Sequence, residues 1–155
     1  MSIFNHLLHL NLSQDQITSV NRLETFLTSP VQVFMLKGYA GSGKTTILKG
    51  LVDYLVDIGK DFALMAPTGR AAKVIREKTG QEAFTIHKSI YSYDDMEEVN
   101  EGDSFYYLYK IRNNVDVVGK IFIVDEASML SDAKSEGEFF RFGSSHLLSD
   151  LITYT

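Results

Sequence analysis

The sequence predicts an α/β domain in which helices flank a parallel β-sheet. Three short apolar runs, at residues 31–37, 61–66 and 121–124, have the length and composition of buried strands. Each of the first two runs leads through a turn into a segment whose apolar residues recur at helical spacing. Because strands that alternate with helices are typical of parallel sheets, this order predicts a βαβα unit followed by a further parallel strand.

The length and composition predict one domain over residues 1–155. A chain of 155 residues, 45% apolar and 23% charged, can bury a single core of ordinary size. The sequence contains no apolar run long enough to cross a membrane, no signal peptide at its start, and no cysteine for a disulfide or a thiolate zinc site. We therefore expect a cytoplasmic monomer without a membrane partner.

The charge of the chain is unevenly distributed. A net charge of −5 is unfavourable for nucleic-acid binding when the chain is taken as a whole. Six acidic residues, however, lie between positions 94 and 103, so the rest of the chain carries +1, which is −5 less −6. The total charge therefore does not exclude nucleic-acid binding.

Local signals give approximate bounds for the helices. Ser13 and Gln16 have the spacing of a capping box, which marks the start of the first helix. The predicted helices, each with its stop signal, are residues 14–28 before Pro30, an apolar stripe from Ile47 to Leu55 before Gly59, and residues 70–79 before Gly80. The helical and strand patterns are lost in residues 91–119, where we expect a small excursion with one or two strands. A last amphipathic helix is expected near residues 147–152.

Residues 38–45 read GYAGSGKT, a full match to the phosphate-binding pattern GxxxxGK[ST]. The match lies between a predicted strand and a predicted helix, which argues against the alternative of a glycine-rich turn with a solvated lysine. Lys44 would reach the β and γ phosphates of a nucleotide, and Thr45 would place its hydroxyl on Mg²⁺. The predicted phosphate-binding residues are Gly38, Gly41, Ser42, Gly43, Lys44, Thr45 and Thr46.

An acidic pair follows the last predicted strand. Asp125 would hold Mg²⁺ through water, and Glu126 would orient and deprotonate a water molecule for attack on the γ phosphate. The carboxyl ends of parallel strands meet at one edge of a sheet, so we expect the acids to converge with Lys44 and Thr45. The predicted catalytic residues are Lys44, Asp125 and Glu126, the predicted metal ligands are Thr45 and Asp125, and the predicted cofactors are ATP and Mg²⁺.

Four segments, in order, carry a resemblance to a known family. They are GYAGSGKTT from residue 38, APTGRAAK at residues 66–73, TIHKS at residues 85–89 and VDEASML at residues 124–130. In that order they resemble motifs I, Ia, Ib and II of superfamily 1B DNA helicases, the group of RecD-like, Pif1-like and Dda-like enzymes. The resemblance implies a RecA-like fold, ATP-driven translocation on single-stranded DNA from 5′ to 3′, and duplex unwinding.

The resemblance also implies roles for residues outside the phosphate loop. By position, Thr68 and Arg70 match the motif that meets the DNA backbone, and His87 matches the next motif along the strand. Lys73 adds to the basic segment that begins at Arg70, which could equally be an ordinary solvated helix face. We therefore expect Thr68, Arg70, Lys73 and His87 to contact single-stranded DNA, with an internal packing role as the alternative for His87.

Two further features of the family have counterparts in this chain. Family members read adenine with a glutamine in a pattern like LNxxQ, and Leu10, Asn11 and Gln14 match it. Gln16 is a competing candidate, but its place in the capping box predicts that its side chain caps the first helix. Gln14 is therefore the expected nucleotide contact. A strand-separating hairpin, the pin, falls between motifs Ib and II in the family, in the interval of residues 91–119.

The chain ends about thirty residues after Glu126, which leaves no room for a second RecA-like domain of the 100 to 200 residues typical of a domain. That domain supplies the arginine finger in the family, so we expect the chain alone to hydrolyse ATP weakly and not to unwind DNA. The rival functions are another P-loop ATPase or nucleotide kinase, and a DNA-binding module that holds ATP without turnover.

Overall fold

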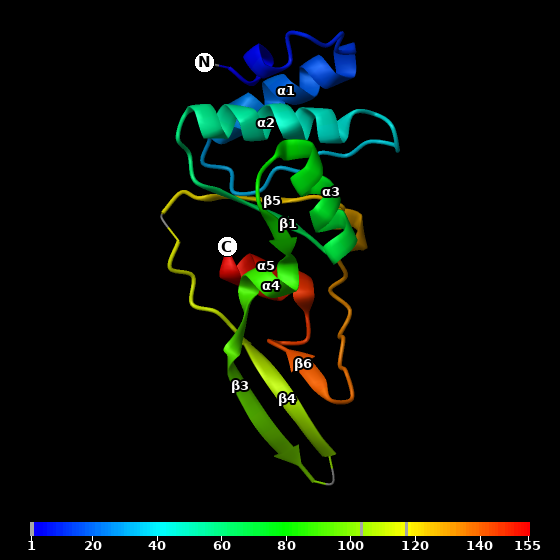
Figure 1. Cartoon of the computed structure of the whole chain (residues 1–155), viewed down its shortest axis with the longest axis vertical. Coiled ribbons are helices and arrows are strands. Elements are labelled where there is room, and N and C mark those ends of the chain that lie inside the picture. Colours follow the sequence, from blue (N-terminus) through cyan, green and yellow to red (C-terminus); the bar gives the residue numbers. More distant parts are fainter. Residues whose placement is uncertain (1, 103, 117) are drawn as a thin grey trace. The chain divides into compact units, whose positions relative to one another are not determined.

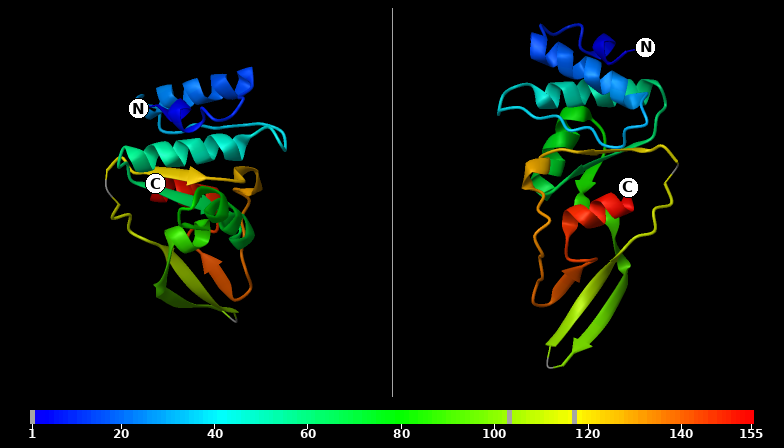
Figure 2. Two further views of the ribbon diagram at one scale, coloured as in Figure 1. Left: turned by 45° about the horizontal axis from the view of Figure 1, so that its top comes forward. Right: turned by 180° about the vertical axis from the view of Figure 1, so that it is seen from behind.

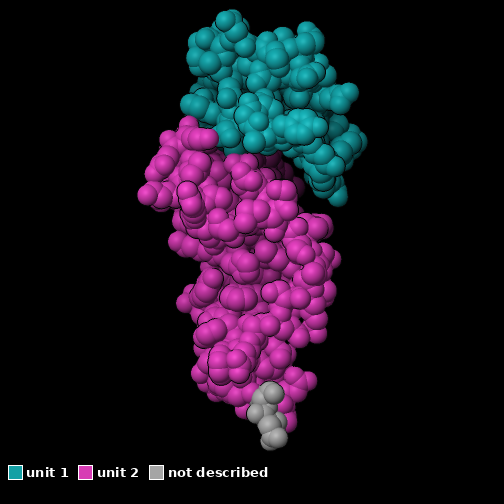
Figure 3. All heavy atoms as spheres, turned by 90° about the vertical axis from the view of Figure 1, so that its right-hand side faces the viewer, with its two compact units in different colours: residues 1–61 teal, residues 62–155 magenta. Residues whose placement is uncertain are grey.

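The computed structural model describes residues 2–102, 104–116 and 118–155, which form two compact units. Unit 1 comprises residues 1–61 and unit 2 comprises residues 62–155 (Figure 3). All the strands that the structure describes belong to unit 2, and the described part of unit 1 contains helices only.

Unit 1 contains a short 3-10 helix, η1 (Ile3–His6), and the helices α1 (Gln14–Leu27) and α2 (Lys44–Asp57). The capping box predicted at Ser13 is confirmed, because the side chains of Ser13 and Gln16 each accept a hydrogen bond from the other's backbone N–H. Glu24 joins η1 to α1, since its carboxylate accepts from the Ser2 hydroxyl at 2.6 Å and from the Ile3 N–H at 2.7 Å.

The prediction of a buried, paired strand at residues 31–37 is wrong. The segment carries no strand ladder in the structure, and the side chains of Val31, Val33 and Met35 are 59%, 72% and 68% exposed. Phe34 is only half-buried and packs against Phe26, with ring centroids 5.4 Å apart. A strand is stabilised by a hydrogen-bonded neighbour, and the described part of unit 1 offers none.

Unit 2 contains the parallel sheet that the sequence predicts. Strands β1 (Phe62–Ala66), β2 (Ala83–Thr85) and β5 (Ile121–Val124) lie in the order β2-β1-β5, and both pairings are parallel. Figure 1 labels β1 and β5. Helix α3 (Gly69–Thr79) packs on β1 and β2 and ends at Gly80, whose left-handed φ of 70° makes it the predicted C-cap. The α/β fold class is confirmed.

A second sheet lies in the excursion that precedes β5 and in the tail that follows it. Strands β3 (Tyr91–Glu101) and β4 (Ser104–Ile111) form an antiparallel hairpin, and β6 (Phe140–Phe142) pairs with β4 in parallel (Figure 2). The two strands of the excursion agree with expectation. β6 was not predicted, because its three residues carry too little pattern to be recognised. It is held by ring stacking, for example between Tyr109 and Phe142, whose centroids lie 4.9 Å apart.

The core of unit 2 gathers around two short helices, α4 (Ile86–Ile90) and α5 (Leu147–Tyr154). One buried cluster of this core consists of Met65, Ile86, Ile90, Tyr91 and Leu151. Because Met65 is on β1 and Tyr91 begins β3, this cluster joins the parallel sheet to the base of the hairpin. Phe122 and Val124 of β5 also pack against this cluster, so the loops that follow β1 and β5 both begin at strands that share it.

Candidate nucleotide-binding and DNA-binding sites

The phosphate loop of unit 1 has the backbone that anion binding requires. Gly41 and Gly43 have φ values of 78° and 85°, a left-handed conformation that other residues rarely adopt. Gly43 is the N-cap of α2, and the helix has no side-chain cap there. The first N–H groups of α2 therefore lack helical partners and point out of the helix end, as at sites that bind phosphate.

Lys44 bends back over this loop. Its ammonium donates to the carbonyl oxygens of Gly38 at 2.7 Å and Tyr39 at 2.9 Å. An ammonium group has three donors, so two hydrogen bonds hold the side chain in place and one donor remains for a phosphate oxygen. Thr45 and Thr46 follow in the first turn of α2 and are partly buried.

Of the two glutamines considered for the nucleotide, the structure brings Gln16 to the loop. The Gln16 amide donates to the carbonyl oxygen of Ser42 at 3.1 Å, and a Cβ at Gly43 would overlap that amide. Gln14 is the first residue of α1, and its side chain is exposed. The capping box was the signal for this contact, because it directs the Gln16 side chain toward the N-terminal end of α1.

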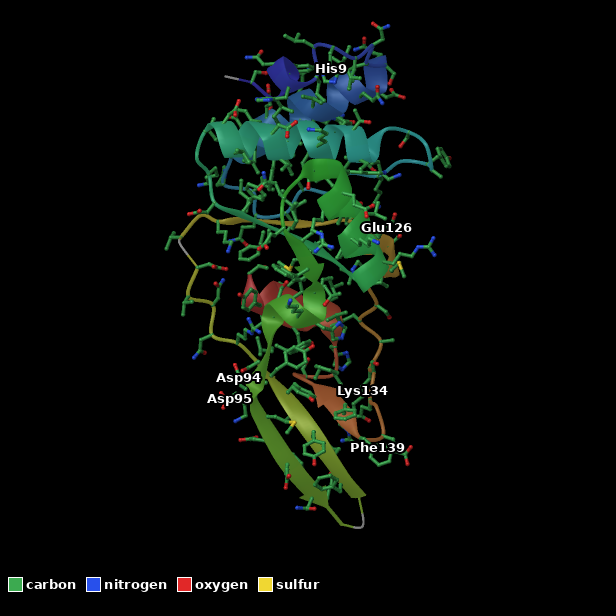
Figure 4. All side chains as sticks on the ribbon, viewed as in Figure 1. His9, Asp94, Asp95, Glu126, Lys134 and Phe139 are labelled. Atoms are coloured by element: carbon green, nitrogen blue, oxygen red, sulfur yellow. The ribbon has the colours of Figure 1, made fainter. Side chains whose placement is uncertain are left out.

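The acidic pair of unit 2 follows β5 as the sequence predicts. The Asp125 N–H donates to the Met65 carbonyl at 3.1 Å, which continues the ladder between β5 and β1 by one residue. Its carboxylate accepts from the Glu126 N–H at 2.9 Å. Glu126 has a left-handed φ of 54° and an exposed side chain at the start of the 3-10 helix η2 (Ala127–Met129) (Figure 4).

The backbone of Glu126 is a strained feature. A residue with a Cβ in this left-handed region costs about 1–2 kcal/mol, and such costs concentrate at functional sites. The sharp turn ends β5 and separates the two carboxylates, so Asp125 stays partly buried against the sheet while Glu126 reaches solvent. One acid is thus held in place and the next is free to meet a water molecule.

The residues expected to contact DNA have unequal surroundings in unit 2. Thr68 caps α3, because its hydroxyl oxygen accepts from the Ala71 N–H at 3.2 Å. Arg70 and Lys73 are exposed on α3. His87, by contrast, lies half-buried among aromatic rings, 5.6 Å from Tyr91 and 5.1 Å from Phe142 between ring centroids. Its surroundings favour the internal packing role.

Burial lowers the pKa of His87 below its ordinary value of 6.5. The unfolded chain therefore binds a proton at this site at a higher pH than the folded chain does. Stability then rises with pH across the interval between the two pKa values. We expect the free energy of unfolding to fall as the pH drops below about 6.5.

Urea unfolding at pH 7.5 and pH 5.5 measures this effect. The wild-type chain should lose more stability on acidification than His87→Gln, which cannot titrate there. His9→Gln, at an exposed histidine, should keep the wild-type pH dependence (Figure 4). An equal loss in the wild type and in His87→Gln would contradict the prediction.

The two halves of the expected nucleotide site belong to different units. The phosphate loop is in unit 1, and Asp125 and Glu126 are in unit 2, so their convergence on one nucleotide stays a prediction. Among the described residues, no three His, Asp or Glu side chains gather as a ready-made metal cage. No helix within the described ranges is long and apolar enough to cross a bilayer.

Several known proteins are similar in sequence to this chain. Residues 11–139 match the model of the AAA domain family. The ATP-dependent RecD2 DNA helicase of Deinococcus radiodurans is 34% identical over 77 residues, covering 50% of this chain and 10% of that protein. The ATP-dependent DNA helicase dda of Enterobacteria phage T4 is 32% identical over 78 residues, covering 50% of this chain and 18% of that protein.

A longer alignment joins the chain to a third relative. DNA helicase B of Mus musculus is 28% identical over 160 residues, covering 77% of this chain and 13% of that protein. The chain thus spans between 10% and 18% of the length of these three relatives. The family match includes the phosphate loop and the acidic pair, and the family implies the use of ATP with a divalent metal ion. The chain therefore belongs to the AAA domain family, within the superfamily 1B group of RecD-like and Pif1-like helicase motor domains.

Proposed function

We propose that this chain is the ATP-binding and ATP-hydrolysing motor domain of a DNA helicase, which couples hydrolysis to movement along single-stranded DNA and to duplex unwinding. The observation that carries the proposal is the phosphate loop. There the Lys44 ammonium donates to the carbonyl oxygens of Gly38 and Tyr39, at the start of α2, which has no side-chain cap. The named relatives support the DNA part, because all three are DNA helicases.

The residues of the chain fit a magnesium-bound triphosphate. Mg²⁺ is commonly held by one or two protein oxygens together with phosphate oxygens and water, so a cage of three acids is not needed. Thr45 and Asp125 are the residues that would hold it. When bound, the metal ion neutralises charge on the phosphates.

Each of the other residues has a distinct part in this scheme. The Lys44 ammonium and the N–H groups at the start of α2 would bind and orient the phosphates. Glu126, exposed and on a strained turn, would accept the proton of the attacking water. For the adenine contact, the pattern match favours Gln14, whereas the hydrogen bond to Ser42 favours Gln16.

The DNA side of the scheme concerns unit 2. Thr68, Arg70 and Lys73 lie at the start of α3, where exposed cations can meet a phosphodiester backbone. A second RecA-like domain would complete the motor with its arginine finger, so the active enzyme would be a longer cytoplasmic protein than the present chain.

Lys44→Ala tests the nucleotide site. A hydrogen bond to a charged group contributes about 1.5–3 kcal/mol, so the substitution should weaken ATP affinity by about 10- to 150-fold. Lys49→Ala is the matched control, because Lys49 is exposed on the same helix and pairs with Asp53, at 2.6 Å, away from the phosphate loop's carbonyl groups. Calorimetric titration with a non-hydrolysable ATP analogue measures both. Equal affinities for the two variants would count against the proposed site.

The effect of single-stranded DNA on ATP hydrolysis separates the motor from its rivals. In the longer protein, DNA should raise the hydrolysis rate, and Lys44→Ala should remove that rate. A phosphoryl acceptor that raises ATP consumption in place of DNA would identify a kinase. ATP binding without any hydrolysis would identify a passive DNA-binding module.

A further inference from the structure

We propose that one face of the sheet built from β3, β4 and β6 is a docking surface for an arginine-rich segment of a protein partner. This surface, the ring face, carries a row of aromatic rings bordered by carboxylates, a combination that selects a planar cation. The inference goes beyond the proposed motor function, because none of its residues is among the expected contacts of ATP or DNA. The ring face consists of Tyr93, Met96, Glu98, Phe105, Tyr107, Tyr109 and Phe140.

The members of the ring face lie on one side of the sheet. Along β4, Phe105, Tyr107 and Tyr109 alternate with side chains that point to the other side. Met96 lies opposite Tyr109 and Glu98 opposite Tyr107, and directly opposed residues of an antiparallel pair share a face. The rings form one continuous row. Its centroid distances are 5.2 Å from Tyr93 to Tyr109, 6.1 Å from Tyr109 to Phe140, 5.9 Å from Phe140 to Tyr107 and 4.9 Å from Tyr107 to Phe105.

The row of rings continues the core of unit 2 onto the surface. At its inner end, Tyr109 stacks on Phe142, and both pack against the buried cluster around α4 and α5. Farther along, Met96, Phe105 and Phe140 are 42%, 40% and 51% exposed. Neighbouring apolar side chains that remain exposed in this way mark interaction surfaces. Within the described residues, the outer part of the row is therefore open to a partner.

Carboxylates border the rings. Glu98 is exposed and lies opposite Tyr107 in the ladder. Asp94 and Asp95, both exposed, directly follow Tyr93 on β3 (Figure 4). These carboxylates attract a cation and repel a phosphodiester backbone or an anionic lipid surface. The charge therefore favours a basic protein segment over a nucleic acid.

The cations of the sheet lie on its other side. Among the described residues of β3, β4 and β6, the basic side chains are Lys110 and Arg141. Lys110 alternates with the rings of β4 and pairs with Glu97. Arg141 lies over Tyr106, which also alternates with those rings. Neither cation shares a face with Glu98, so the ring face can take its cation from a partner.

Arginine fits the ring face better than lysine does. A guanidinium group is planar, stacks on aromatic rings and is more weakly hydrated than an ammonium group. The other side of the sheet already shows this contact, because the Arg141 guanidinium lies 3.7 Å from the centroid of the Tyr106 ring. Carboxylate oxygens of Glu101 and Glu136 each lie 3.8 Å from one of its nitrogens. A partner's arginine would stack on the exposed rings in the same way and donate to Glu98.

Fluorescence anisotropy with a labelled peptide of alternating arginine and serine tests the ring face in the complete chain. At low salt, this peptide should bind about two- to fivefold more tightly than its lysine counterpart. Phe105→Leu and Phe140→Leu keep an apolar side chain but remove the ring, so each should weaken binding of the arginine peptide by about two- to fivefold. Glu98→Gln should weaken it by a similar factor and make binding less sensitive to salt.

Glu97→Gln and Phe84→Leu are the matched controls, and both should bind the arginine peptide as the wild type does. Glu97 is the neighbour of Glu98 on β3, but its side chain lies on the other side of the sheet with Lys110. Phe84 is a 38% exposed ring of the other sheet, and the Lys88 ammonium already lies 4.3 Å from its centroid.

Three results would overturn the proposal. If Glu97→Gln weakens binding as much as Glu98→Gln, only the net charge of β3 matters. If the lysine peptide binds as tightly as the arginine peptide, the rings do not select the cation. If the ring substitutions weaken binding of a labelled oligothymidylate but not of the arginine peptide, the ring face stacks bases instead. Should Phe140→Leu unfold β6, Phe105→Leu still decides the outcome, because Phe105 lies on β4 beside the hairpin turn.

Discussion

Glu126→Gln should lower the rate of ATP hydrolysis by about 10²- to 10⁴-fold and leave ATP affinity within about twofold of the wild type. The substitution keeps the size of the side chain but removes the group that would accept a proton from water. The Glu126 side chain is exposed, and its contact with the Asp125 carboxylate is made by the backbone N–H, so the backbone turn and the position of Asp125 should persist. The expected loss is therefore one of chemistry rather than of binding.

Single-turnover hydrolysis, with the protein in excess over labelled ATP, measures this rate even when turnover is slow. Glu98→Gln, an exposed acid on β3, makes the same chemical change far from the phosphate loop in sequence and should hydrolyse ATP as the wild type does. A Glu126→Gln variant that loses ATP affinity as severely as it loses rate would show that Glu126 supports the structure of the site and does not act on water.

Asp150→Ala should reduce the free energy of unfolding of the chain by about 3 kcal/mol. Asp150 is 2% exposed, and its carboxylate accepts from the Tyr91 hydroxyl at 2.6 Å and from the Ser144 hydroxyl at 2.6 Å. It also accepts from the Ser144 N–H, at 3.0 Å to the nearer oxygen. The alanine variant would leave the buried Tyr91 hydroxyl without a partner, which costs more than the lost hydrogen bond itself.

Tyr91 remains a donor in this network at every working pH. Burial, followed by the hydrogen bond and the negative charge of Asp150, raises the pKa of Tyr91 well above its ordinary value of 10. The network joins the start of β3, the turn before α5, and α5 itself, so it secures the base of the hairpin. Its loss should loosen α5 and the hairpin together.

Thermal melting followed by circular dichroism checks the prediction. At about 2–4 °C per kcal/mol for a chain of this size, Asp150→Ala should lower Tm by roughly 6–12 °C. Asp132→Ala is the control, because Asp132 also accepts hydrogen bonds at α5, from the Ser149 N–H and hydroxyl, but is exposed. Its loss should cost about 1 kcal/mol. Equal shifts in Tm for the two variants would mean that the burial of Asp150 adds nothing.

Local chemistry made several elements predictable. The start of α1 follows from the Ser13 capping box, because a cap needs only residues three positions apart. The end of α3 follows from Gly80, since a left-handed C-cap selects glycine. The bounds of β5 were predicted to the residue from four apolar positions followed by two acids. Each of these signals acts over a few residues of chain.

Long-range contacts made other elements unpredictable. The apolar run at residues 31–37 has the composition of a strand, but pairing depends on a neighbour that composition does not reveal. β6 has only three residues and depends on rings supplied by β4, more than thirty positions earlier. The Gln16 side chain donates to the carbonyl oxygen of Ser42, 26 positions later, and the capping box gives the direction of that side chain but does not reveal which distant residue it will meet.

The amino-acid sequence by itself determined the α/β class, the phosphate loop, the acidic pair and the family, because these depend on residue type and on short spacings along the chain. The tertiary structure decided that His87 is packed among aromatic rings while Lys88 lies over Phe84 beside the α3 cations. It also decided that Asp150 is buried. Burial and side-chain partners depend on elements far apart in sequence, and local patterns carry no information about which of those elements will meet.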